Sequence, residues 1–66
     1  MNKITSVARQ IRTNDTILFR NTLHDVVQME WDKTLDLVYV TLDQWSDGTE
    51  TRFVFDGSEH VTFIRP

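Results

Sequence analysis

The sequence predicts a small all-β domain of five to six short antiparallel strands that close, or nearly close, into a barrel. Asp47-Gly48 is a hairpin dipeptide, and it separates two runs of β-branched and aromatic residues. A second turn at Asp56-Gly57 precedes an alternating segment that ends beside Pro66, the only proline. With 66 residues, the chain is too short for a β-sandwich, which needs about 100, so a barrel is favoured.

The C-terminal half contains the clearest strand patterns. Residues 34–45 and 49–55 flank the first turn, and residues 60–65 follow the second. In the first of these segments Val38, Val40 and Leu42 alternate with Tyr39, so the two sets lie on opposite faces of the strand. Both faces are apolar, which is more than one wall of a barrel requires.

The N-terminal half has shorter patterns. Residues 16–20 and 25–31 read as strands, and residues 12–15 as a turn. Ile4, Val7, Ala8 and Ile11 have helical spacing, whereas Ile4, Ser6 and Ala8 equally fit one face of an edge strand. We expect a strand followed by a single helical turn around residues 7–11.

The order of these elements resembles a known fold family. The segments that carry the likeness are residues 11–17 (Ile-Arg-Thr-Asn-Asp-Thr-Ile), 26–32, 38–41, 47–49, 53–56 and 59–61. They are similar to small SH3-like barrels of uncharacterised bacterial and phage proteins. Asn14 stands where those barrels often have glycine, and asparagine tolerates the same left-handed backbone. The resemblance implies a fold and transfers no activity or functional residue.

Composition limits the class of protein. Residues 1–66 form one domain with one thin core. Because there is no cysteine, disulfides and thiolate zinc sites are excluded, and no cofactor is expected. The first residues lack the apolar stretch of a signal peptide, and no run approaches the length of a membrane span. We therefore expect a cytoplasmic protein with no membrane contact.

Charge is unevenly distributed along the chain. Up to Arg20 there are four cations against one anion, and thereafter three cations against nine anions, for a net charge of −3. An acidic balance disfavours a general nucleic-acid binder, which usually has a basic face. A nucleic-acid or nucleotide-binding adaptor stays open as an alternative function. Its contacts would come from Arg9, Arg12, Arg20 and Arg52.

No catalytic motif is present, so we expect a protein that is not an enzyme. His24-Asp25 and Glu59-His60 are adjacent acid–imidazole pairs, but neighbouring residues of a strand point to opposite faces. The close aspartates flank turns, where aspartate is favoured for backbone reasons. The two isolated glycines do not form a phosphate-binding loop.

The sequence favours a protein–protein interaction module, including self-association. Tryptophan and tyrosine are preferred anchors of interfaces, and an apolar second face of the long strand can form an exposed patch. The expected partner-binding residues are Trp31, Leu35, Leu37, Tyr39 and Trp45, with Arg9, Arg12 and Lys3 meeting an acidic neighbour. The alternative is that the strand is long, bent and buried on both faces.

Overall fold

The computed structural model describes residues 2–44 and 49–66, and it forms six strands and one 3₁₀ turn. The elements are β1 (Asn2–Val7), η1 (Ala8–Gln10), β2 (Thr16–Phe19), β3 (Thr22–Asp32), β4 (Leu37–Gln44), β5 (Thr49–Asp56) and β6 (His60–Arg65). The all-β prediction is confirmed, and so is the N-terminal strand followed by a helical turn. In the described part of the chain, no helix has the length and apolar character needed to span a membrane.

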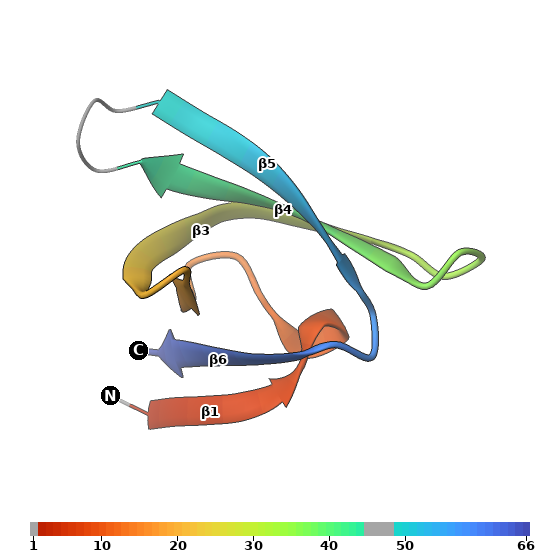
Figure 1. Ribbon diagram of the computed structural model, residues 1–66, viewed down its shortest axis with the longest axis horizontal. Helices are drawn as coiled ribbons and strands as arrows, with labels where there is room; N and C mark the ends of the chain where they lie inside the picture. Colours follow the sequence, from red (N-terminus) through yellow and green to blue (C-terminus); the bar gives the residue numbers. More distant parts are fainter. Residues whose placement is uncertain (1, 45–48) are drawn as a thin grey trace.

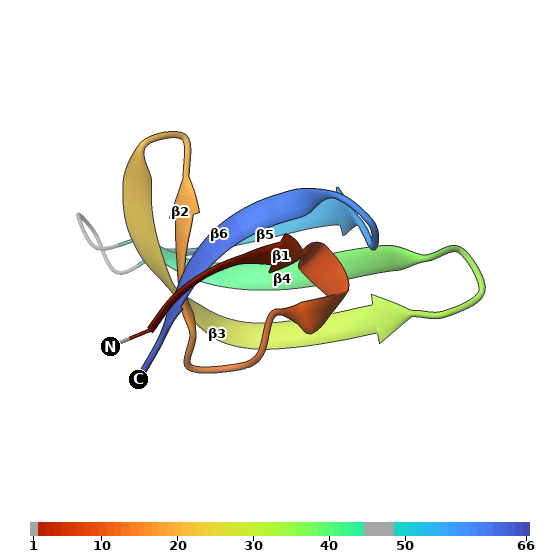
Figure 2. The same cartoon turned by 90° about the horizontal axis from the view of Figure 1, so that it is seen from below.

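All six strands pair antiparallel in one sheet of order β1-β6-β2-β3-β4-β5. The sheet bends so that β3, β4 and β5 lie over β1 and β6 (Figure 1). The β2–β3 hairpin projects at one end and the β3–β4 turn at the other (Figure 2). Among the described residues β1 and β5 are the two ends of the strand order, so the sheet is open.

The long strand β3 joins the two halves, and a bulge at Val27 lets it do so. Val26 pairs with Leu42 but Gln28 pairs with Thr41, which leaves Val27 as the extra residue. The extra residue reverses the alternation, so Val26 is buried and Val27 is exposed. Simple alternation through residues 25–31 would place Val27 on the face of Met29, but the bulge puts Val27 on the opposite face.

Two tight turns use left-handed residues. Arg20 and Asn21, with φ of 52° and 64°, connect Phe19 and Thr22, which gives a two-residue type I′ hairpin. Asn14 has φ 78°, as expected for a position that glycine often occupies. The predicted turn at Asp47-Gly48 lies outside the described residues.

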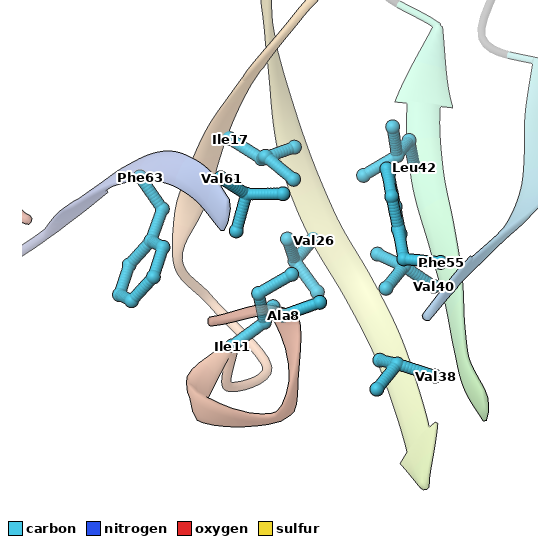
Figure 3. Close-up of a cluster of buried hydrophobic side chains, with 10 residues drawn as sticks. All are labelled: Ala8, Ile11, Ile17, Val26, Val38, Val40, Leu42, Phe55, Val61 and Phe63. Carbon is cyan, nitrogen blue, oxygen red and sulfur yellow. The ribbon is translucent and has the colours of Figure 1, made fainter. Parts of the chain in front are cut away.

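The core lies between the two halves of the bent sheet (Figure 3). Its members are Ala8, Ile11, Ile17, Val26, Val38, Val40, Leu42, Phe55, Val61 and Phe63. The predicted inner face of the long strand is therefore confirmed. Phe19 of β2 also reaches Phe53 of β5, with ring centroids 4.4 Å apart, and so links the two halves of the sheet.

The strand predicted over residues 34–45 begins later, at Leu37. The Asp32 carboxylate accepts hydrogen bonds from the backbone N–H groups of Thr34 and Leu35, at 3.0 and 3.2 Å. This side-chain cap holds residues 33–36 in a turn, as aspartate commonly does. Leu35 therefore lies in a turn and not in the strand.

Candidate protein-interaction surface

The predicted partner-binding residues separate into two groups. Leu37 and Tyr39 lie on the outer face of β4, opposite the buried Val38 and Val40. Trp31 pairs with the core residue Val38 and so lies on the inner side of the sheet, where it is 36% exposed. Trp45 lies outside the described residues.

The outer face of β3, β4 and β5 forms a surface that we call the Tyr39 face. Two rows of cross-strand neighbours build it, and their side chains share one side of the sheet. The first row is Glu30, Tyr39 and Val54, and the second is Gln28, Thr41 and Arg52. The guanidinium of Arg52 lies 4.7 Å from the centre of the Tyr39 ring, and its Nη2 is 3.2 Å from Glu30 Oε2.

A shallow polar depression of about 100 Å³ lies within the Tyr39 face. Its lining residues are Gln28, Glu30, Tyr39, Thr41 and Arg52. Amide, hydroxyl, carboxylate and guanidinium groups therefore surround one aromatic ring. Beside the depression Val54 is 55% exposed, which adds apolar surface to the polar groups. This combination provides both hydrogen-bonding and apolar contacts for a partner.

The second group surrounds Trp31 at the β3–β4 turn. Trp31 Nε1 donates a hydrogen bond to Asp36 Oδ1 at 3.0 Å, and Arg9 Nη2 lies 3.7 Å from Asp36 Oδ2. Arg9 also donates from Nε to the Gly57 carbonyl oxygen at 3.1 Å. Arg9 thus connects η1 to two turns, while Leu35 at the tip is 63% exposed.

Gly57 offers a test of this second group. A Cβ at Gly57 overlaps the Asp36 carboxylate, so Gly57→Ala forces Asp36 away from Trp31 and Arg9. We expect a loss of about 1–3 kcal/mol in the free energy of unfolding. In an Asp36→Ala background the same substitution is expected to lower the free energy of unfolding by less. A double-mutant cycle measured by urea denaturation tests this. Equal costs in both backgrounds would contradict this interpretation.

The four arginines of the alternative function have different surroundings. Arg9 and Arg52 each face a carboxylate of the chain itself, Asp36 and Glu30. Arg20 lies over the rings of Phe19 and Phe53, at 4.9 and 5.9 Å from their centres. Arg12 is exposed beside the Asp15 turn, and Lys3 is exposed on β1. A cation that already faces a carboxylate is a weaker phosphate contact, which disfavours Arg9 and Arg52 in that role.

The two histidines lie on different strands. His24 Nδ1 is 3.2 Å from the carbonyl oxygen of Asp43, and His60 is exposed opposite Val7. Within residues 2–44 and 49–66 no group of three or more acidic or histidine side chains is arranged to hold a metal ion.

Sequence reasoning missed the most buried charge of the described chain. Asp15 is 1% exposed, and its two carboxylate oxygens accept hydrogen bonds from Arg65 Nε and Nη2 at 3.0 and 2.9 Å. The backbone N–H of Arg12 donates to the same carboxylate at 2.8 Å. The hydrogen bonding between Arg65 and the Asp15 carboxylate raises the pKa of Arg65. Residues 50 apart in sequence give no local signal of such a pair.

An exposed leucine pair was also missed. Leu18 and Leu23 are cross-strand neighbours in the β2–β3 hairpin, on the face opposite the buried Ile17. Their side chains are on the outer side of the sheet, away from the part of β3, β4 and β5 that forms the Tyr39 face. Leu18 lies beside Thr62 of β6.

The sequence matches no model of a known protein family and none of the curated proteins.

Proposed function

We propose that this chain is a small protein-interaction module and that its partner contacts the Tyr39 face. The observation that carries the proposal is the stack of Arg52 on Tyr39, which is fixed by Glu30 on an outward-facing part of the sheet. Tyrosine and arginine are among the residues that contribute most to the binding energy of protein interfaces.

The arrangement also lowers the entropic cost of binding. Tyr39 is in the central strand of three, so its backbone is held on both sides by β3 and β5. Arg52 lies over the Tyr39 ring and beside Glu30, and these two contacts favour one orientation of its side chain before a partner binds. Exposed Val54 supplies apolar area beside these polar groups.

Tyr39→Ala is expected to weaken capture of the partner by the tagged chain roughly 30-fold, the effect of losing a residue worth about 2 kcal/mol. The measurement is affinity capture from a lysate of the natural host, with and without nuclease, quantified by mass spectrometry. Thr5→Ala, on the exposed outer side of β1, is the matched control and should leave capture unchanged.

Two results would overturn the proposal. In one, the Tyr39→Ala and Thr5→Ala variants both capture the same partner protein as efficiently as the natural sequence does. In the other, enrichment disappears after nuclease treatment, which would favour the nucleic-acid adaptor and direct attention to Arg12 and Arg20.

The proposal includes the finer fold assignment, an SH3-like barrel. Its support is the bulge at Val27 in β3, the strand that joins the two halves of the sheet, and the contact between Phe19 and Phe53, which links those halves. A small barrel of this kind holds its outer strands rigid while leaving their solvent faces free for a partner.

A further inference from the structure

The geometry points to a second interaction surface, the outer edge of β5, and to a second copy of this chain as its occupant. In the described chain β5 is hydrogen-bonded to β4 alone and ends the strand order. No strand is drawn beyond it in Figure 1. An unpaired edge is a template for another strand.

The direction of the backbone groups along this edge follows from one hydrogen bond. The Gly57 N–H donates to the Asp36 carbonyl oxygen at 2.8 Å, and these two residues extend the β4–β5 register by one pair. Hydrogen-bonded and non-hydrogen-bonded pairs alternate along an antiparallel ladder. Arg52 and Val54 therefore direct their backbone N–H and C=O groups away from β4, toward the open edge, and so does the N–H of Asp56. The Asp56 carbonyl oxygen already accepts a hydrogen bond from the Glu59 N–H at 3.0 Å.

The side chains of these three residues are self-complementary under a two-fold axis. An antiparallel pairing centred on Val54 places Val54 opposite Val54 of the second copy. Arg52 and Asp56 each lie two residues from the centre, so each Arg52 faces Asp56 of the other copy. Each residue is exposed in the single chain. Pairing by this axis forms two opposite-charge pairs around an apolar centre.

Other registers of the same edge are less favourable. Centring the axis on Arg52 or on Asp56 places like charges opposite each other, and centring it on Phe53 or Phe55 removes the Arg52–Asp56 pairs. The other edge differs in its side chains, because β1 carries the exposed Lys3 and Thr5 on its outer side. β5 carries Val54, 55% exposed, between two exposed side chains of opposite charge, Arg52 and Asp56.

Such a dimer extends the proposed binding surface. Val54 pairs with Tyr39 inside each chain, so the central contact joins the two Tyr39 faces into one continuous outer surface. The dimer and the proposed function share Arg52 and Val54. Tyr39→Ala leaves the residues of the β5 edge unchanged, so the two proposals can fail separately.

Sedimentation equilibrium of the full chain, from about 10 μM to about 1 mM, tests the inference. We expect a concentration-dependent dimer, twice the 7.8 kDa mass of one chain, that weakens as salt rises. Asp56→Arg places two pairs of like charges opposite each other and should weaken association at least about tenfold. Adding Arg52→Asp to that variant exchanges the charges at positions 52 and 56, so opposite charges face each other again. Association should then return to within about threefold of the original.

Two further variants separate edge pairing from other effects. Asp25→Arg, an exposed position on β3 outside this edge, makes the same change of net charge and should leave association unchanged. Val54→Pro removes a backbone donor that points away from β4, so it should abolish the dimer while circular dichroism retains the β signal. A single-chain mass up to about 1 mM overturns the inference. So does a dimer that Asp56→Arg and Asp25→Arg affect equally.

Discussion

Replacing Phe63 with alanine is expected to leave most of the chain unfolded. Phe63 is 1% exposed and is among the largest fully buried side chains of the core, where it pairs with Ile17 across β6 and β2. Truncating a buried phenylalanine costs about 3–5 kcal/mol. A domain of this size rarely has more than about 3–5 kcal/mol of stability from one core. Far-ultraviolet circular dichroism and urea denaturation will measure the loss.

Leu18→Ala is the matched control for this substitution. Leu18 is on β2, which also pairs with β6, but its side chain is on the outer face and 44% exposed. Its truncation is expected to cost less than about 1 kcal/mol, because little apolar area returns to water. Similar losses of stability for Phe63→Ala and Leu18→Ala would contradict the burial of Phe63 between the two halves of the sheet.

Removing the Asp15 carboxylate has the second-largest expected effect. Asp15→Ala leaves the guanidinium of Arg65 and the backbone N–H of Arg12 without their shared acceptor. Loss of one member of a buried pair costs roughly 3–5 kcal/mol. Because 26% of the Arg65 side chain is exposed, water replaces part of the interaction, and we expect about 3 kcal/mol for Asp15.

Asp15→Asn removes the charge of this side chain but keeps its shape. The amide oxygen can still accept from one neighbour, so its loss of stability should be smaller than that of Asp15→Ala. Thermal melts of both variants and of Asp25→Asn, an exposed aspartate on β3, provide the comparison. If Asp15→Ala melts as the natural chain does, the bond between the C-terminal strand and the 12–15 turn contributes little.

Local patterns predicted most of the fold because each strand carries its own alternation. Val38, Val40 and Leu42 alternate with Tyr39, which placed the core face and the outer face of β4 correctly. The bulge at Val27 was not predictable in the same way. It follows from how β3 pairs with β4 after leaving β2, and that depends on residues remote in sequence.

The candidate surface was predictable only in part, for a similar reason. The residue types of Leu37 and Tyr39 indicated an apolar outer face, but Arg52 and Glu30 joined it through cross-strand register. The basic beginning of the chain was expected to meet an acidic neighbour. In the folded chain Arg9 lies beside Asp36 of the chain itself, a contact that requires η1 to pack near the β3–β4 turn.

Chemical-shift mapping of the full chain against its captured and purified partner tests the central claim most directly. The measurement is a titration of the isotope-labelled chain followed by amide resonances. The account predicts that the largest shifts fall on Glu30, Tyr39, Thr41 and Arg52, with those of Leu18 and Leu23 unchanged. Shifts confined to Leu18 and Leu23, with the Tyr39 face unaffected, would contradict it.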